Sequence, residues 1–419
     1  MDADLAASAS KWAAESNSAV FIQLVSGETV EGVLRALDTD LSQDVDEEEE
    51  DDEEEEGGAD VIQFHPTFTY PIYGEHERVF GYKGLRISLS YAAGSLATYF
   101  DISYKKRIDE MESSLPVQLR ADDVDTPMRK VLSPAAVCPT KAEFARRVAR
   151  DTREFRPLGR KAHEYTRDSE EEEGGGGSDA VYEIYESDFV SGEFREYHRR
   201  MQTLVLFYIE GAQFIDDSDD KWRVFTVFER LVISGTASYT LVGFCTMYQF
   251  FSWPDRRRPR ISQFLVLPPF QGQGHGSELY RHIYQTVLRN PEYADLTVED
   301  PSEAFDDMRD RNDMRYLLQQ DAFAGLEAPV SPATLRQLQE RYKISKRQMT
   351  RCVEMGLLKS LDKTRQKDRY QEYRLFVKRR IYAQNTDLLA GLEDDEKKKK
   401  VAESFAAVED DYHRILSLL

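Results

Sequence analysis

Hydrophobic side chains recur along the chain with two different periods, and the changes between them outline the elements. From residue 62 to 108, aromatic and aliphatic residues alternate with polar ones between glycines, which predicts a strand-rich segment. Residues 194–210 have helical spacing instead, and 224–228 and 241–250 are apolar runs of strand length. The pattern therefore predicts a compact α/β region over 180–325, after a strand-rich N-terminal part.

The two ends of the chain favour helices. Residues 5–15 are predicted as a helix that precedes a strand at 20–25. Between the strand-rich and α/β regions, residues 109–166 have a mixed, loop-rich pattern. From residue 331 onward Leu335, Leu338 and Tyr342 recur at helical spacing. Ser345 followed by Gln348 predicts a capping box, and a last helix is expected over 396–418.

A strand, a glycine-dense turn and a helix follow one another from residue 261 onward. Residues 261–267 form the predicted strand, and the helix carries an apolar stripe of Leu279, Ile283 and Val287. Such a turn directs backbone N–H groups and a positive helix end at an anion. The glycines of the turn let a phosphate approach the backbone, because a Cβ would block it.

The spacing within this turn narrows the choice of ligand. Gln271-x-x-Gly274-x-Gly276 is neither the G-x-G-x-x-G dinucleotide pattern nor a P-loop, which needs a following Lys-Ser or Lys-Thr. It is similar to the loop with which acetyltransferases of the GNAT superfamily hold the pyrophosphate of acetyl-CoA. His275, within this turn, is more often a turn or cap residue than a catalyst.

A carboxylate ends the next predicted strand, at 294–298. Ligands gather at the carboxyl ends of strands in open α/β sheets, which makes Glu299 a candidate general base. Asp300 is expected to N-cap the following helix, with Pro301 at its first position and Glu303 completing a capping box. The alternative for Glu299 is a carboxylate that only stabilises that helix.

Transfer of acetyl to a lysine has one main chemical obstacle. The amine has a pKa near about 10.4, is protonated at neutral pH and cannot attack a thioester until a carboxylate takes its proton. A backbone N–H donor must then stabilise the oxyanion. This chemistry requires no metal.

The net charge of −22 is concentrated in two runs. Residues 46–56 are all acidic, and Asp168 with 170–173 adds five more acidic residues, so the remainder of the chain carries −6. Both runs are expected to lie in disordered, solvated insertions. The alternative is that they bind a basic protein substrate loosely. Residues 332–383 have the opposite balance, with 15 Lys and Arg against 5 Asp and Glu.

Cysteine usage and hydropathy limit the class of protein and its compartment. Three widely spaced cysteines favour neither a disulfide framework nor a zinc site and fit a reducing compartment. The N-terminus has no signal-peptide pattern, and no apolar run approaches the roughly 18 residues of a membrane span. A soluble nuclear or cytosolic protein is expected.

Several motifs together resemble one family. The stretches 264–280 and 296–301 are similar to the type B histone acetyltransferase catalytic subunit. Other segments that resemble it are 80–85, 93–96, 194–198, 200–203, 214–216 and 253–255. These matches span about 62–382, and they are more specific than the glycine turn alone.

The resemblance implies an α+β fold of the GNAT acetyltransferase type, with a mixed, splayed sheet flanked by helices. It implies an α+β N-terminal domain over 1–179 with acidic insertions at about 42–59 and 167–179, a catalytic domain over 180–328 and a helical domain over 329–419. It further implies transfer of acetyl from acetyl-CoA to N-terminal tail lysines of newly synthesised histone H4. The alternatives are acetylation of another protein amine and a non-catalytic, acidic histone-binding chaperone.

Site residues follow from the resemblance position by position. Glu299 matches the catalytic base, and Glu210 and Asp300 match carboxylates that assist it. The cofactor-binding positions implied are Phe264, Leu265, Val266, Gln271, Gly272, Gln273, Gly274, His275, Gly276, Ser277 and Ser302. The substrate-binding positions implied are Glu75, His76, Glu77, Trp222, Tyr248, Gln249 and Phe250. His76 stands where an acidic residue is expected, and Ser302 where the family often has Asn. From composition alone, Trp222 is expected in the core and the stretch 248–251 half in the core and half on the surface.

Partners and location are implied in the same way. Carboxylates and apolar walls suit the charges and aliphatic stems of a basic histone tail. The expected partners are histone H4, with histone H3 as its companion, and a WD-repeat histone chaperone that docks on the N-terminal part. No direct nucleic-acid or membrane binding and no metal are expected, and the expected location is the nucleus and cytoplasm.

Overall fold

The computed structural model describes residues 11–38, 59–110, 119–167, 180–233 and 235–419. It divides into a first unit, Met1–Thr246 with Gln263–Gln273, and a second unit, Met247–Ser262 with Gly274–Leu419. The predicted acidic insertions lie, apart from their edge residues, outside the described residues. The three-domain division over 1–179, 180–328 and 329–419 stays a prediction.

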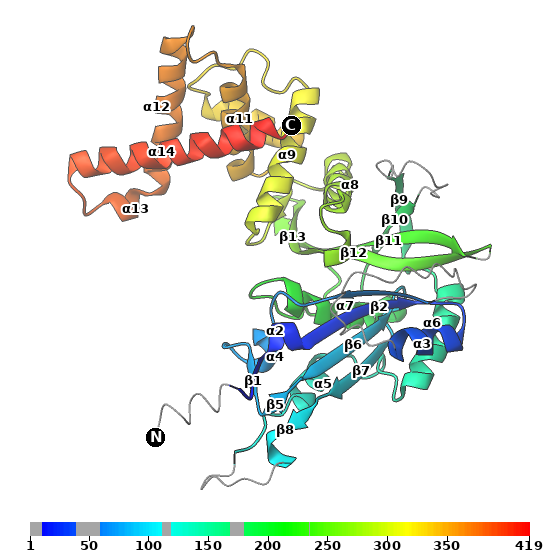
Figure 1. The fold of residues 1–419 in the computed structure, drawn as a ribbon. Helices are drawn as coiled ribbons and strands as arrows, with labels where there is room; N and C mark the ends of the chain where they lie inside the picture. Colours follow the sequence, from blue (N-terminus) through cyan, green and yellow to red (C-terminus); the bar gives the residue numbers. More distant parts are fainter. Residues whose placement is uncertain (1–10, 39–58, 111–118, 168–179, 234) are drawn as a thin grey trace, which may run out of the picture. The chain divides into compact units, whose positions relative to one another are not determined.

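The N-terminal part of the first unit is built on a four-stranded sheet (Figure 1), as the alternating pattern predicts. Its strand order is β3-β2-β6-β7, with β2 and β6 parallel and the outer pairs antiparallel. The bounds are β2 Val20–Ser26, β3 Asp60–Phe64, β6 Arg86–Ala92 and β7 Thr98–Ser103. The strand predicted at 20–25 is thus confirmed.

Two helices, α3 (Val30–Asp38) and α6 (Lys141–Glu154), pack on this sheet. Phe144, Ala145 and Val148 of α6 meet Val25 and Val33 in one buried cluster. The prediction of a mixed, loop-rich segment over 109–166 is wrong for α6. The apolar pattern did not indicate this helix because at least half of its residues are charged and alanines form much of its buried stripe. Thr140 begins it as an N-cap that accepts a hydrogen bond from the N–H of Glu143.

The helix predicted at 5–15 is wrong for its described part. Residues 11 and 12 form a turn, and Ala13–Glu15 is strand β1, which pairs antiparallel with β4 (Arg78–Phe80). Pairing with a distant strand overrides the local helical spacing. The small remaining elements of this part are α2 Ser16–Ala19, α4 Tyr70–Tyr73, β5 Tyr82–Lys83, β8 Lys106–Arg107, η1 Ile108–Glu110 and α5 Asp125–Val131.

The second large sheet has the order β14-β13-β12-β11-β10-β9. Its strands are β9 Arg160–Thr166, β10 Val181–Ser187, β11 Trp222–Ile233, β12 Thr236–Ser252, β13 Arg256–Val266 and β14 Thr297–Val298. Helix α7 (Gly192–Tyr208) confirms the helical spacing of 194–210, and ten of its residues are buried. The strand predicted at 294–298 is shorter than expected, since only single bridges at Tyr293 and Leu296 extend β14.

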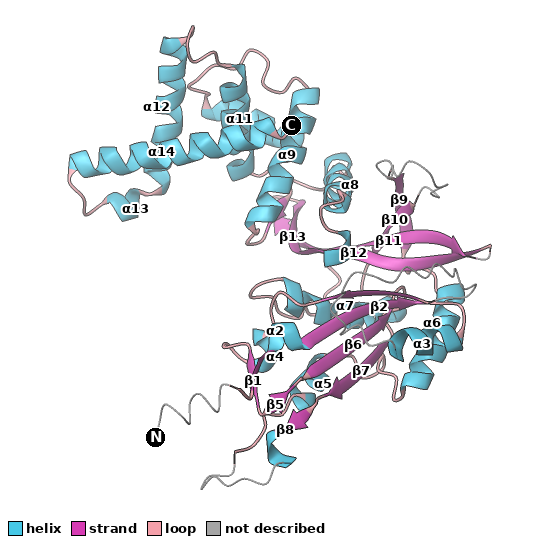
Figure 2. Ribbon diagram, viewed as in Figure 1, coloured by secondary structure: helices cyan, strands magenta, loops and turns pink. Residues whose placement is uncertain are grey.

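Helices make up most of the second unit, as Figure 2 shows by colour. They are α8 His275–Arg289, α9 Glu303–Gln319, α10 Pro332–Tyr342, α11 Lys346–Ser360, α12 Lys367–Gln384, α13 Thr386–Leu389 and α14 Asp394–Ser417. The predicted stripe of Leu279, Ile283 and Val287 is buried on α8. The last helix, expected over 396–418, is confirmed as α14 within two residues at its start and one at its end.

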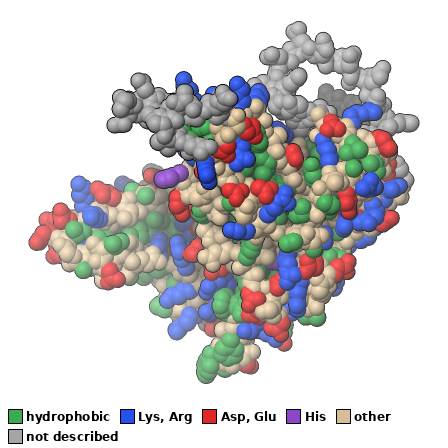
Figure 3. Space-filling view, turned by 90° about the horizontal axis from the view of Figure 1, so that it is seen from below, with side chains coloured by type: hydrophobic (Ala, Val, Ile, Leu, Met, Phe, Trp, Pro, Cys, Tyr) green, Lys and Arg blue, Asp and Glu red, His purple; other side chains and the backbone are tan. Residues whose placement is uncertain are grey.

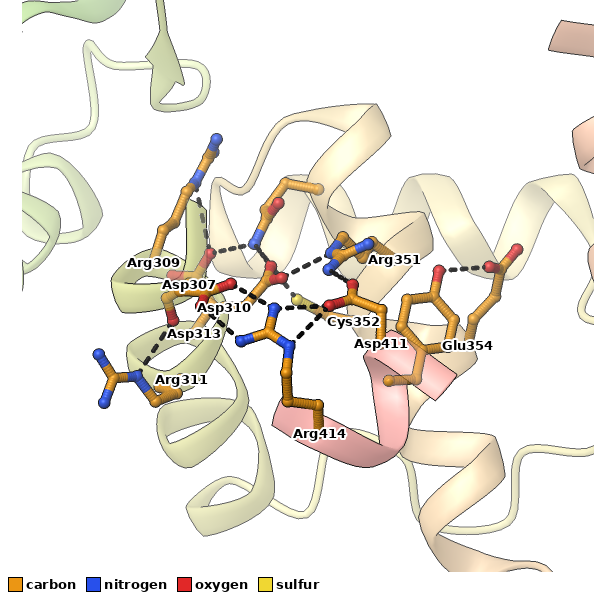
Figure 4. A network of polar contacts seen from close by, with 12 residues as sticks. Asp307, Arg309, Asp310, Arg311, Asp313, Arg351, Cys352, Glu354, Asp411 and Arg414 are labelled. Carbon is orange, nitrogen blue, oxygen red and sulfur yellow. Dashed lines mark hydrogen bonds and ion pairs between the residues drawn. The ribbon is translucent and has the colours of Figure 1, made fainter. Parts of the chain in front are cut away.

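Buried ion pairs connect the helices of this unit (Figure 4). Arg351 joins Asp310 of α9 to Asp411 of α14, and Glu354 accepts two hydrogen bonds from Arg380 of α12. The capping box predicted from Ser345 and Gln348 is wrong, because Gln348 is buried and donates to Asp310 and Asp313. A buried amide satisfies buried carboxylates here rather than a helix end.

Acidic and basic side chains are interspersed on the face drawn in Figure 3. This mixture agrees with the small charge of −6 that remains outside the two acidic runs. Neither the acidic nor the basic side chains form a continuous patch on that face.

Candidate active site

The loop that follows β13 is held by side-chain amides. After β13 the chain makes a short 3₁₀ turn, η2 (Pro268–Phe270). Gln271 donates to the carbonyl of Val266 at 2.8 Å, and Gln273 donates to the carbonyl of Pro269 at 2.9 Å. Both predicted cofactor-binding glutamines therefore stabilise the loop through their side-chain amides.

Two glycines of the predicted loop have left-handed backbone conformations. Gly272 has φ 74° and Gly274 φ 89°, angles that favour glycine strongly. A Cβ at either position would lie in open space, with no protein atom other than those of its immediate chain neighbours within 4 Å. Gly274 is also the N-cap of α8 and offers no side-chain cap, so the first N–H groups of this helix have no acceptor from it.

The first turn of α8 in the second unit holds the other predicted loop residues. His275 is the first helical residue and only 1% exposed, which fits its reading as a turn residue. Asn312 of α9 donates to the hydroxyl of Ser277 at 3.0 Å. Sequence reasoning missed Asn312, since nothing local relates residues 35 positions apart.

Glu299 lies where β14 ends, as predicted. β13 and β14 pair in parallel through Arg260 with Thr297 and Ile261 with Val298, and the N–H of Glu299 donates to the carbonyl of Ile261 at 2.9 Å. The carboxylate is exposed, and its Oε2 accepts a hydrogen bond from Ser262 at 2.7 Å. Sequence reasoning missed Ser262, because the strand register that pairs it with Glu299 comes from the sheet.

The predicted capping role of Asp300 is wrong. Ser302 is the N-cap of α9, and its hydroxyl accepts from the N–H of Phe305 at 3.3 Å. Asp300 has φ 33° and turns the chain between β14 and the helix, with its side chain exposed. A serine is as good a cap as an aspartate, and the turn at Asp300 moves the helix start by two residues.

β13 extends beyond the end of β14. Its side chains alternate, with Leu265 buried and Phe264 and Val266 half-buried, so the latter two share the more open face. At the buried edge, Gly243 of β12 lies so close that an added Cβ would be 2.4 Å from the carbonyl oxygen of Leu265. Gly243 is a further residue that the sequence motifs did not identify.

Glu210 is exposed just after α7 in the first unit. The segment before α4 runs beside the end of this helix: the N–H groups of Thr67 and Phe68 donate to the carbonyl of Phe207. The N–H of Gly211 donates to the hydroxyl of Tyr70 at 2.6 Å. The structure therefore connects the Glu210 turn to helix α4, which directly precedes the predicted substrate residues 75–77.

Glu77 has a structural role in addition to any binding role. Its carboxylate accepts hydrogen bonds from the N–H of Thr69 at 2.7 Å, the N–H of Tyr70 at 3.1 Å and the side chain of Asn17 at 3.0 Å. Burial alone would raise the pKa of Glu77, but these hydrogen bonds hold it below its ordinary value. Glu75 and His76 are exposed in the same turn.

We expect Glu77→Ala to destabilise the start of α4 by about 1–2 kcal/mol, because helix-end N–H groups lose their acceptor. Since the folded pKa is lowered, the stabilisation is full above the unfolded pKa of about 4.3 and is lost as pH falls through the folded pKa. Hydrogen exchange of residues 69–77 at pH 7 and pH 3 measures this. Glu75→Ala is the matched control, and equal exchange in both variants would contradict the capping role.

The predicted aromatic positions differ in accessibility. Tyr248 and Phe250 form an edge-to-face pair with ring centroids 4.6 Å apart, and Phe250 is 39% exposed with Arg260 over its ring. Gln249 is buried, and its carbonyl oxygen accepts from Tyr293 and Arg257, both at 3.1 Å. Trp222 begins β11 and is half-buried. Gln249 therefore fixes the strand, and Phe250 is the more accessible of the three residues on β12.

A cavity in the first unit is lined by other residues. It has a volume of about 450 Å³ and is lined by Arg160, Glu186, Asp188, Ser191 and Arg223 among others. None of the predicted site residues lines it. Its charged walls pair among themselves, Arg160 with Glu186 and Arg223 with Asp188.

The described residues contain neither a candidate metal site nor a candidate membrane-spanning helix. In these parts of the chain no three His, Cys, Asp or Glu side chains are grouped so that they could hold a metal ion. Within the same residues, no helix is both long and apolar enough to span a bilayer.

Sequence models of known protein families match three successive parts of the chain. Residues 12–210 match the sequence model of the family described as "Histone acetyl transferase HAT1 N-terminus". Residues 179–305 match the "Acetyltransferase (GNAT) family", and 310–362 match "Fungal HAT1, C-terminal".

Similar curated proteins cover most of the chain. One from Cryptococcus neoformans is 38% identical over 381 residues, which are 85% of this chain and 90% of that protein. A human protein is 32% identical over 381 residues, 86% of this chain and 88% of its own length. A mouse protein is 36% identical over 324 residues, covering 77% and 75%. All three are named histone acetyltransferase type B catalytic subunit.

Proposed function

Because this chain belongs to the family of type B histone acetyltransferase catalytic subunits, we propose that it acetylates N-terminal tail lysines of newly synthesised histone H4. Family membership makes it a histone acetyltransferase that depends on acetyl-CoA, and the predicted α+β fold of the GNAT type is confirmed. The choice of H4, the mechanism and the residue roles below are parts of the proposal.

The observation that carries the proposal is the loop from Gln271 to Ser277. Gly272 and Gly274 have backbone angles that favour glycine and face open space, and α8 begins without a side-chain cap. Such a loop fits a pyrophosphate, whose oxygens accept hydrogen bonds from backbone N–H groups. When bound, acetyl-CoA supplies the thioester that the substrate amine attacks.

The remaining cofactor-binding residues are proposed from the resemblance and fit their surroundings. Phe264, Leu265 and Val266 would contact the acetyl and pantetheine end through backbone groups, on the part of β13 that extends beyond β14. Ser302 caps α9 through its side chain, so a cofactor contact from it would need a lone pair or proton not used in the cap.

Glu299 is proposed as the general base that takes the proton from the substrate ammonium. It is exposed, at the carboxyl end of β14, and one carboxylate oxygen is already oriented by Ser262. Asp300 and Glu210, both exposed, are proposed to assist by attracting the lysine and its basic neighbours. A positioned base of this kind contributes about 10²–10⁴ in rate.

The histone tail is proposed to bind Glu75, His76, Glu77, Trp222, Tyr248, Gln249 and Phe250. Glu75 and His76 are exposed, and Phe250 presents a ring that already contacts the guanidinium of Arg260 at 4.6 Å. Aromatic faces of this kind attract lysine and arginine side chains. Glu77 and Gln249 would act mainly by holding their segments in place, given their internal hydrogen bonds.

Partners and location complete the proposal. We propose histone H3 as the companion of H4, a WD-repeat histone chaperone as a subunit that docks on the N-terminal part, and the nucleus and cytoplasm as the location. The resemblance to type B enzymes supports these points.

Mass spectrometry of recombinant H3–H4 after incubation with the purified chain and acetyl-CoA tests the proposal. We expect acetyl groups on H4 tail lysines ahead of H3 lysines and chain N-termini. A peptide with a free N-terminal amine and no lysine is present in the same reaction. It distinguishes a lysine acetyltransferase from a protein N-terminal acetyltransferase. Modification of that peptide in preference to H4, or no acetyl transfer at all, would overturn the proposal.

We expect Gly274→Ala to weaken acetyl-CoA binding tenfold or more, because the new methyl group would project into the open space where a diphosphate must approach. Gly325→Ala is the matched control, since Gly325 also has a positive φ and open surroundings but lies outside the loop. Both variants should lose about 1 kcal/mol of stability from backbone strain. Calorimetric titration with acetyl-CoA distinguishes them, and equal affinities would contradict a phosphate site at Gly274.

A further inference from the structure

We propose that Ser262 is a positioning residue for the general base: its hydroxyl holds the Glu299 carboxylate in one orientation. This inference rests on the proposed function, because it assigns a role in the same reaction. It concerns a residue outside the predicted set of catalytic, cofactor-binding and substrate-binding positions.

The register of two parallel strands brings these residues together. Arg260 lies opposite Thr297 and Ile261 opposite Val298, and the N–H of Glu299 continues the ladder to the carbonyl of Ile261. The next position on β13 is Ser262, so its side chain and that of Glu299 are neighbours across the pair. A one-residue slip would turn Ser262 to the opposite face and break this relation.

The side-chain geometry agrees with the register. Ser262 Oγ and Glu299 Oε2 are 2.7 Å apart, a short hydrogen bond that the hydroxyl donates to the carboxylate. The neighbours Ile261 and Gln263 are buried on the other face, so the half-buried Ser262 lies on the open face of the strand. Backbone pairing on β13 therefore fixes where the hydroxyl can reach.

One carboxylate oxygen remains for the substrate. Of the described residues, Ser262 alone hydrogen-bonds to the Glu299 carboxylate, through Oε2, which leaves Oε1 to receive a proton. The charged groups nearby on these strands have other partners: Arg258 pairs with Asp295, and Arg260 lies over Phe250. Asp300, next in the chain, is turned by its positive φ.

The chemistry of the bond gives it two effects. A hydroxyl that donates to one carboxylate oxygen fixes the plane of the carboxylate, so the second oxygen faces one direction. It also restricts a side chain that is otherwise free to rotate at an exposed strand end, and small errors in the position of a base are costly. Both effects disappear with the hydroxyl.

The test compares kcat and KM for an H4 tail peptide in three variants. Ser262→Ala is expected to lower kcat/KM about 3- to 30-fold, with the loss in kcat and little change in KM for the peptide. Ser262→Thr keeps the hydroxyl and suits a strand, so it should restore most of the lost kcat. Thr297→Val, which removes a hydroxyl bonded to the Pro259 carbonyl on the same strand pair, should leave both constants unchanged.

The outcomes separate the two proposals. Equal melting temperatures of the three variants exclude a folding defect, and an unchanged KM for acetyl-CoA excludes a cofactor effect. A kcat of Ser262→Ala equal to that of the parent chain, or a Thr variant as impaired as Ala, overturns the positioning role while the acetyltransferase activity stands. A parent chain that acetylates no H4 peptide overturns the proposed function and this inference together.

Discussion

Glu299→Gln is expected to lower kcat for acetylation of an H4 peptide by about two to four orders of magnitude at pH 7. Glutamine preserves the shape of the side chain and can still accept the Ser262 hydrogen bond, but it cannot take a proton from the substrate ammonium. The lysine amine, with a pKa near about 10.4, then depends on solvent to lose its proton. Steady-state kinetics across pH 6–10 measure the effect, and the deficit should narrow as pH rises.

Two controls confine this result to the proton transfer. Binding of acetyl-CoA by calorimetry should persist, because Glu299 lies outside the glycine loop. Glu303→Gln removes an exposed carboxylate four residues away, in the first turn of α9, and should change kcat less than threefold. Unchanged turnover of Glu299→Gln at pH 7 would remove this residue from the base role.

Glu354→Ala is expected to destabilise the helical part of the second unit by about 3–5 kcal/mol. The carboxylate, labelled in Figure 4, is 0% exposed. It accepts from Arg380 Nε at 2.7 Å and Nη2 at 2.8 Å, and from the Tyr412 hydroxyl at 2.7 Å. Its removal leaves the guanidinium of Arg380, which is 25% exposed, and the buried hydroxyl of Tyr412 without their acceptor between α11, α12 and α14. The penalty of an uncompensated buried charge exceeds the net gain from the pair itself.

Hydrogen exchange of α11, α12 and α14, together with the thermal transition, measures this destabilisation. The matched control is Asp395→Ala, which breaks the ion pair with Lys398 at the exposed start of α14, where both side chains are more than three-quarters exposed. An exposed pair contributes less than about 1 kcal/mol, so this variant should behave as the parent chain. Equal effects of the two substitutions would show that burial does not make the Glu354 pair important.

Local sequence features predicted several parts of the candidate site well. The predicted glycine turn is present, with positive φ at Gly272 and Gly274, and the helix predicted after it is α8, which buries the predicted apolar stripe. Glu299 follows a strand as predicted. In each case the information lies within a few residues, which is the range over which backbone angles and capping act.

Expectations failed where a local signal competed with a distant partner. Gln348 has the spacing of a capping box, yet its amide satisfies Asp310 and Asp313 inside the helical unit. Residues 13–15 join a strand 65 positions away in the pairing of Ala14 with Val79. Ser302 and not Asp300 is the N-cap of α9, because the chain turns at Asp300 before the helix begins.

The sequence by itself determined the family and, through that resemblance, the fold class, together with the glycine loop and the position of the general base candidate, because these depend on motifs of residues close together in the chain. Only the tertiary structure decided that Ser262 contacts Glu299, that Asn312 contacts Ser277 and that Glu354 lies between Arg380 and Tyr412. Strand register and helix packing set those contacts, and both arise from burial of side chains far apart in the sequence.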